Sequence, residues 1–164
     1  MFAAVDTNFL LGLAGDDDDA LDAVDTLRRR APGLSIVATP TPLLELGFFR
    51  DQTEDLRLQA ASAKVLACFK PLWGFQVATL DRDKQRRITK VGDHLRRVGL
   101  LPLAERHDSF ILAEAALIEA SLLITQDSEL RGVDYPRLVF ELGRFKLHPP
   151  VLATPAEIVH KFFQ

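Results

Sequence analysis

The stretch Phe2-Ala3-Ala4-Val5-Asp6 decides the fold, because a short apolar run ends abruptly at a carboxylate. An apolar run without alternation is typical of a parallel strand that is buried on both faces. Leu122-Leu123-Ile124-Thr125 repeats the pattern and is followed by Asp127. Weaker strand candidates are residues 35–38, 75–79 and 138–140.

Helical patterns separate these strands. They cover residues 21–30, 42–50, 56–69, 84–98, 108–120 and 156–163. We expect Thr41 and Pro42 to be the N-cap and first residue of the second helix, and Thr154, Pro155 and Glu157 to form a capping box before the last one. Strands that alternate with helices predict an α/β protein. The expected architecture is a three-layer α/β/α sandwich with a central, mostly parallel sheet, in a single domain over residues 1–164.

Composition narrows the class of protein. The chain of 164 residues is 48% hydrophobic and 26% charged, which is typical of a folded domain, and its net charge is −3. Binding to nucleic acid would therefore need a local basic patch. The single cysteine, Cys68, excludes an internal disulfide and a thiolate metal cluster. No apolar run reaches the roughly 18 residues of a membrane span, so we expect a cytoplasmic protein that does not enter the membrane.

Two carboxylates follow the strongest predicted strands. In an open parallel sheet, ligands bind beyond the carboxyl ends of the strands, near the point where the strand order reverses. Asp6 and Asp127 are expected at that edge, either as N-caps of the following helices or as site residues. The acidic run at residues 16–19 is interpreted as a solvated loop before a helix.

Two more carboxylates lie in predicted helices. Glu45 is the polar side chain within the apolar segment 43–49, and a buried carboxylate needs a partner, a proton or a cation. An ion pair with Arg50 or a distant arginine is the structural alternative. Asp108 starts an Ala-rich helix, where the helix dipole alone would favour it by at most about 1 kcal/mol.

Together these segments resemble the acidic motifs of PIN-domain ribonucleases, and the VapC-like toxin branch in particular. The matching segments, in order, are Val5-Asp6-Thr7-Asn8, Glu45 within its helix, Asp108 before Ala113, Ala115 and Ala116, Leu123-Ile124-Thr125-Gln126-Asp127, and the closing strand and capped helix over 151–163. The chain departs from many relatives in having Leu130 in place of an aromatic residue. It is also longer than the compact toxins, at 16–19 and 131–150.

The resemblance implies a PIN-like fold and a metal-dependent endoribonuclease. Asp6, Glu45, Asp108 and Asp127 would be the catalytic residues and would hold Mg²⁺ or Mn²⁺, with Asn8 and Thr125 orienting them. Two carboxylates about 4 Å apart repel by roughly 4 kcal/mol at an effective dielectric of ~20, so a dication is a natural compensation. The oxygen donors argue against zinc, and the four histidines show no paired spacing. Thr7 is expected to cap the next helix, and Glu105 is a weaker fifth candidate.

A local basic segment offers a way to attract RNA. Seven basic residues outnumber two acidic ones between Arg82 and Arg97. We expect Arg82, Lys84, Arg86, Arg87 and Lys90 to bind phosphates without reading sequence. The alternative is a solvated helix face opposite Ile88, Val91 and Leu95.

The main hypothesis is therefore an endoribonuclease that forms the toxin half of a toxin–antitoxin pair. The alternatives are a stand-alone RNA-processing or decay nuclease and a non-catalytic module that binds RNA or protein. A phosphoaspartyl enzyme of the haloacid-dehalogenase type is disfavoured, because it needs a second acid where Asn8 stands.

The helix around Glu45 also predicts protein partners. Both of its sides are apolar, whereas a helix covered on one side is usually polar on the other. We expect a homodimer and an apolar surface near Glu45 that an antitoxin covers, unless the helix over 56–69 packs on the second side.

Overall fold

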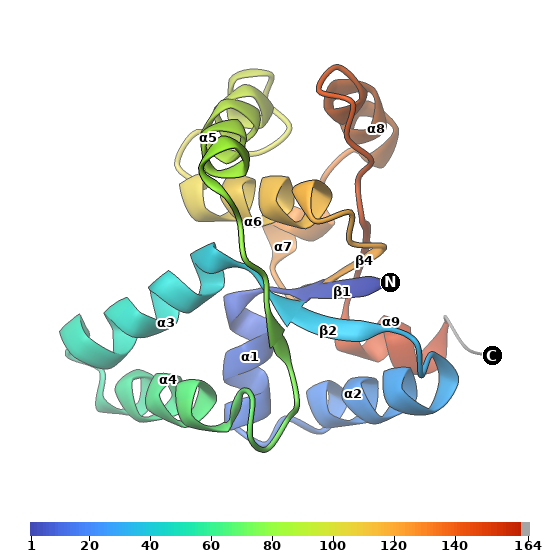
Figure 1. Cartoon of the computed structure of the whole chain (residues 1–164). Helices are drawn as coiled ribbons and strands as arrows, with labels where there is room; N and C mark the ends of the chain where they lie inside the picture. Colours follow the sequence, from blue (N-terminus) through green and yellow to red (C-terminus); the bar gives the residue numbers. More distant parts are fainter. Residues whose placement is uncertain (162–164) are drawn as a thin grey trace.

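The computed structural model describes residues 1–161 and contains a five-stranded sheet in the order β3-β2-β1-β4-β5 (Figure 1). All four pairings are parallel. The strands are β1 (Phe2–Val5), β2 (Ser35–Ala38), β3 (Gln76–Val77), β4 (Leu122–Ile124) and β5 (Val151–Ala153). The predicted α/β class with a parallel central sheet is confirmed.

Helices cover both faces of this sheet. They are α1 (Thr7–Ala14), α2 (Asp18–Arg30), α3 (Pro40–Gln52), α4 (Leu56–Cys68), α5 (Arg82–Arg97), α6 (Arg106–Leu117), α7 (Ser128–Arg131), α8 (Tyr135–Gly143) and α9 (Pro155–His160). In Figure 1, α1, α2, α4 and α9 lie below the sheet and α5, α6 and α8 lie above it. In the described range 1–161, no helix combines the length and the apolar character needed to cross a membrane.

The central strand β1 separates two apolar cores. Ala3 and Val5 belong to the core formed with α1, α2 and α4, whereas Ala4 belongs to the core formed with α5, α6 and α8. All three side chains are fully buried, which explains why the run shows no polar alternation. β1 lies between β2 and β4, so the strand order reverses there, and this is the place where open parallel sheets bind ligands.

Residues 138–140 do not form a strand, so that prediction is wrong. They lie in α8, which Asp134 caps by accepting a hydrogen bond from the Arg137 N–H at 3.1 Å. Leu138 is buried, but Val139 and Phe140 are exposed. Three apolar residues are too few to distinguish a strand from one turn of a helix.

Helices α2 and α3 begin earlier than predicted, and this changes the interpretation of the residues before them. The predicted N-cap Thr41 is wrong, because Thr39 is the N-cap and Thr41 lies within the helix. α3 begins at Pro40 instead of Pro42, since its first turn accommodates both prolines. α2 begins at Asp18, with Asp17 as its N-cap, so the acidic run forms a helix start and not only a loop.

The other helix boundaries differ by a few residues. α5 and α6 each begin two residues before the predicted start, so Asp108 lies in the first turn of α6 and is not its first residue. The predicted capping box of Thr154 and Glu157 is present at α9. That helix was expected to continue through Phe162 and Phe163, which lie outside the described residues.

Candidate active site

A small pocket lies at the carboxyl ends of the strands, and three of the four predicted carboxylates line it. It has a volume of about 80 Å³ and is lined by Asp6, Thr7, Asn8, Glu45, Phe49, Asp108 and Ile111. Asp6 follows β1, Glu45 lies on α3 and Asp108 on α6. Asp127, which follows β4, is near enough to act electrostatically on Asp6 and Asp108. Three of the four carboxylates therefore line one pocket and the fourth lies beside it.

Asp6 is both a helix cap and a pocket residue. One carboxylate oxygen, Oδ1, accepts a hydrogen bond from the Phe9 N–H at 2.7 Å, which caps α1. The other, Oδ2, accepts from the Thr125 hydroxyl at 2.5 Å. The residue is 2% exposed, and this burial raises the pKa of Asp6 to about 6, with smaller contributions from the charges of Asp127 and Glu45. The two roles that the sequence left open thus coexist.

Thr125 connects the carboxylates that follow β1 and β4. Its hydroxyl donates to Asp6 and accepts from the Asp127 N–H at 2.9 Å. Asp127 in turn caps α7 by accepting from the Glu129 N–H at 2.7 Å. The fully buried Thr125 side chain therefore fixes Asp6 relative to the backbone that carries Asp127.

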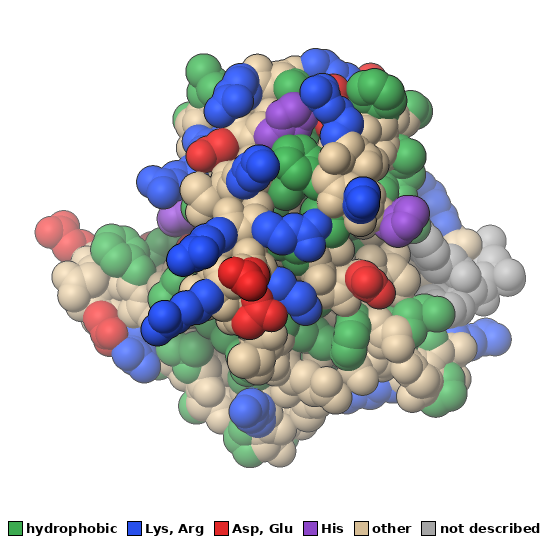
Figure 2. Space-filling model, turned by 45° about the horizontal axis from the view of Figure 1, so that its top comes forward, with side chains coloured by type: hydrophobic (Ala, Val, Ile, Leu, Met, Phe, Trp, Pro, Cys, Tyr) green, Lys and Arg blue, Asp and Glu red, His purple; other side chains and the backbone are tan. Residues whose placement is uncertain are grey.

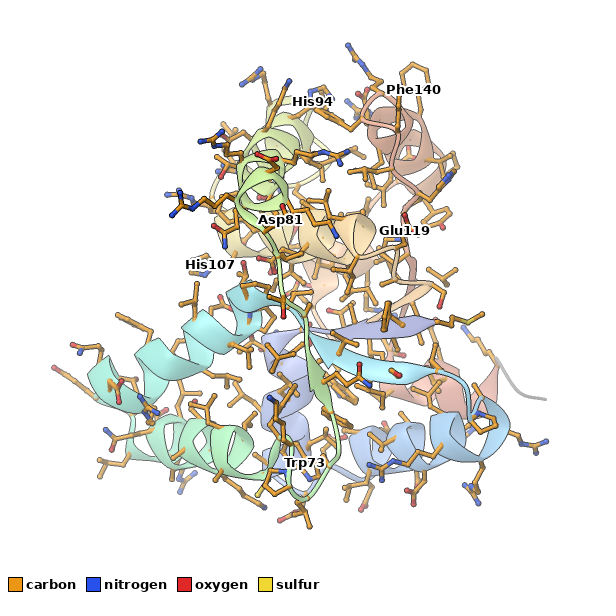
Figure 3. All side chains as sticks on the ribbon, viewed as in Figure 1. Trp73, Asp81, His94, His107, Glu119 and Phe140 are labelled. Atoms are coloured by element: carbon orange, nitrogen blue, oxygen red, sulfur yellow. The ribbon has the colours of Figure 1, made fainter. Side chains whose placement is uncertain are left out.

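Glu45 has partners that the sequence did not reveal. The Thr7 hydroxyl donates to its Oε2, and His107 Nδ1 lies 2.5 Å from its Oε1. Figure 3 shows His107 beside the start of α3. The predicted alternative, an ion pair with Arg50, is wrong because Arg50 pairs with Asp51 at 2.7 Å. The expectation that Thr7 caps α1 is also wrong, since Asp6 is the cap.

Asp108 lines the pocket from the first turn of α6. It is half-buried, and its burial raises the pKa of Asp108 to about 7. The negative charges of Asp127, Glu105, Asp6 and Glu45 raise this pKa further, in that order. Glu105, the weaker fifth candidate, therefore belongs to the same electrostatic cluster.

The donor chemistry of the pocket suits a hard dication. Carboxylate oxygens are the ligands that Mg²⁺ and Mn²⁺ prefer. Burial raises the pKa values of Asp6 and Asp108, and the neighbouring carboxylates raise them further, so a bound dication would favour the ionised form of both. Within residues 1–161, no group of three or more Asp, Glu, His or Cys side chains is arranged to hold a metal ion. Mg²⁺ usually keeps several waters and takes only one or two carboxylates, so the residues fit it without forming a closed cage.

The remaining predicted residues lie outside the carboxylate pocket, apart from Asn8, which is exposed at its wall. Arg82, Arg86, Arg87 and Lys90 are exposed on α5, and the Arg87 guanidinium donates to the Phe145 carbonyl at 3.0 Å. Lys84 is half-buried and lines a different pocket beside β3.

A further buried carboxylate, Glu114 on α6, fixes the start of α3. It is 2% exposed and accepts hydrogen bonds from the Thr41 N–H at 3.1 Å and the Thr41 hydroxyl at 2.8 Å. Burial raises the pKa of Glu114. This contact joins the helices that carry Glu45 and Asp108. Sequence reasoning missed it, although an acid in an Ala-rich helix is the same signal that identified Glu45.

Comparison with known proteins supports the architecture. No family model matches the sequence, and no curated protein matches it. Among solved structures, the chain is similar to one in the crystal structure of VapBC2 from Rickettsia felis bound to a DNA fragment from their promoter. The TM-score is 0.63 at 14% sequence identity, covering 94% of this chain and 98% of that chain. The chain thus shares its α/β fold, over nearly the whole length, with a chain of that VapBC2 structure.

Proposed function

We propose that this protein is a metal-dependent endoribonuclease that hydrolyses RNA phosphodiester bonds. The observation that carries the proposal is the convergence of Asp6, Glu45, Asp108 and Asp127, from four separate segments, at the carboxyl edge of the sheet. A structural role does not require so many like charges in one place, because each raises the free energy of the others. The likeness in fold to a chain of VapBC2 supports the same activity.

In this proposal, the four carboxylates hold Mg²⁺ or Mn²⁺ directly or through water. When bound, the metal would lower the pKa of a water molecule and neutralise charge on the phosphate oxygens. The protein's own groups orient the carboxylates. Thr125 fixes Asp6, while Thr7 and His107 hold the two oxygens of Glu45.

The first test is cleavage of structured RNA by the purified protein in Mg²⁺ or Mn²⁺. We expect cuts in single-stranded or loop regions, and their complete loss when a chelator removes the metal. Restoring excess metal should restore cleavage of the same bonds, which controls for irreversible damage to the protein. Cleavage that persists after complete chelation would contradict the metal-dependent mechanism.

The basic side chains of α5 are proposed to attract the RNA. Figure 2, turned so that α5 and α8 come forward, shows Lys and Arg side chains gathered on this part of the surface. Because they lie outside the carboxylate pocket, they would bind phosphates away from the cleaved bond. Such contacts add affinity but carry no base information.

Reversing the charge of Arg86 and Arg87 is expected to weaken RNA binding similarly for all sequences. The plot of log affinity against log salt concentration should become less steep. The magnitude of its negative slope should decrease by about 2, or about 1 for each lost phosphate contact. The matched control reverses Arg29 and Arg30, which are exposed on α2, in the opposite helical layer. A salt slope equal to that of the unmodified protein would assign α5 to an ordinary solvated surface.

We further propose that the protein is the toxin of a toxin–antitoxin pair and acts in the cytoplasm. The support is the name of the similar structure, a VapBC2 assembly. The antitoxin would inhibit by covering the carboxylate pocket. The helix over 56–69 does pack on α3, as the alternative to a dimer required. Leu44 and Leu56 nevertheless remain 73% and 75% exposed on α3 and α4, and on that ground a homodimer is still proposed. A neighbouring gene for a small DNA-binding protein would favour this role over that of a stand-alone nuclease.

A further inference from the structure

A second and larger pocket adjoins the carboxylate pocket. Its volume is about 470 Å³, within the range of small-molecule sites. It lies between α3 and the start of α6 and is lined by Thr41, Leu44, Glu45, Phe48, Phe49, Arg106, His107 and Phe110. Glu45 and Phe49 line both pockets, so they share a wall.

Three phenylalanines, Phe48, Phe49 and Phe110, line this second pocket. Phe48 is 60% exposed, although water disfavours such a side chain, and its ring lies 6.2 Å from that of Phe49 in an edge-on arrangement. Across the pocket, the Arg106 guanidinium lies 5.3 Å from the centre of the Phe110 ring. Aromatic rings and a guanidinium plane are the surfaces on which single-stranded nucleic acids stack their bases.

The charges of the second pocket match a phosphate-linked ligand. Arg106 is cationic. The one carboxylate in the lining, Glu45, is already hydrogen-bonded through its two oxygens to the Thr7 hydroxyl and to His107. An RNA strand with one phosphate in the carboxylate pocket must continue past Glu45 and Phe49, the residues that line both pockets. The adjoining nucleotide then meets the aromatic side chains, and its phosphate can approach Arg106.

We propose that the second pocket holds one unpaired base of the RNA, in the nucleotide next to the cleaved bond. This inference rests on the proposed nuclease function and specifies its substrate as unstacked RNA. Both polar groups of Thr41 are engaged by Glu114, and the two oxygens of Glu45 by Thr7 and His107, so these lining groups already have partners within the protein. Recognition therefore depends on stacking, which every base can provide, and the pocket selects single-stranded regions more strongly than it selects sequence.

The test measures binding of fluorescently labelled five-nucleotide RNAs in chelator, which prevents cleavage. A set of matched oligonucleotides lacks the base at one position at a time. Removing one particular base should weaken binding roughly 5- to 150-fold, the fold-change equivalent of 1–3 kcal/mol of stacking. Phe48→Ala should weaken binding of the intact RNA to a similar extent. The same base removal should then have little further effect on this variant.

Phe140→Ala is the matched control. Phe140 is 68% exposed on α8, and Figure 3 places it far from His107, so its removal should leave RNA binding unchanged. If RNA binds but no base removal matters, the base pocket is wrong while the nuclease proposal stands. If Phe48→Ala alters only the oligomeric mass, the pocket is a protein interface. Absence of both RNA binding and metal-dependent cleavage would overturn the two proposals together.

Discussion

Replacing Asp6 with asparagine is expected to lower the rate of RNA cleavage by roughly three orders of magnitude while the chain stays folded. A loss of this size is typical when one group that stabilises transition-state charge is removed. Asparagine keeps an oxygen that can accept from the Phe9 N–H, so the cap of α1 survives. It lacks the negative charge that would hold a dication. Asp108→Asn and Asp127→Asn should have similar effects for the same reason.

These variants are compared with the unmodified protein by initial cleavage rate and by circular dichroism. Asp25→Asn is the matched control, because Asp25 is an exposed carboxylate on α2 outside the pocket, and its cleavage rate should not change. Unfolding of the Asp6 and Asp127 variants would show that these carboxylates serve mainly as helix caps. Wild-type rates in folded variants would show that the carboxylate pocket is not where cleavage occurs.

The metal-free protein is expected to lose stability as the pH rises from 5 to 7.5. Burial raises the pKa of Asp6 from 3.8 to about 6, so the folded state binds its proton more tightly than the unfolded state. The resulting stabilisation is fully present below the unfolded pKa and is lost as the pH rises through the folded value. One pKa unit corresponds to 1.36 kcal/mol, so the shift of Asp6 is worth about 3 kcal/mol between pH values below 3.8 and pH values above about 6. Roughly half of that stabilisation is lost between pH 5 and 7.5. Asp108 adds in the same direction, by less than its shift suggests because solvent screens a half-exposed group.

Urea unfolding in chelator at both pH values measures this effect. Asp6→Asn should be more stable than the unmodified protein at pH 7.5 and should lose much of the pH dependence, while Asp25→Asn should retain it. Glu141 and Glu157 have lowered pKa values, so their effects lie below about pH 4.5, outside the chosen interval. Adding Mn²⁺ at pH 7.5 should restore stability in the unmodified protein. An unchanged pH dependence in Asp6→Asn would show that burial of Asp6 is not the cause.

The sequence predicted the parts of the site that obey strong local rules. Asp6 and Asp127 were found because each follows a buried strand, and Glu45 because a carboxylate in an apolar helix needs a partner. The partners themselves could not be predicted. Whether Glu45 meets His107 or Arg50 depends on how α3 and α6 lie against each other, and apolar periodicity does not encode that register.

The prediction of helices and strands also depended on side-chain burial, which the sequence does not state directly. The strand over 35–38 was predicted with its observed bounds because its last three residues are buried between two layers. Residues 138–140 are equally apolar residue types, but two of them, Val139 and Phe140, are exposed to solvent on α8. Apolar character alone therefore did not distinguish a buried strand from an exposed helical turn.

The central position of β1 has a consequence for how a cell makes this protein. Ala3 pairs with Leu122, so the first strand obtains one of its two neighbours only after most of the chain has left the ribosome. A nascent chain that ends earlier lacks Thr125, which holds Asp6, and also lacks Asp127. Under the proposed activity, unfinished chains are inactive although ribosomal RNA surrounds them. If the proposed ribonuclease activity is present, late assembly of the pocket would keep an unfinished chain from cleaving the RNA of the ribosome that makes it.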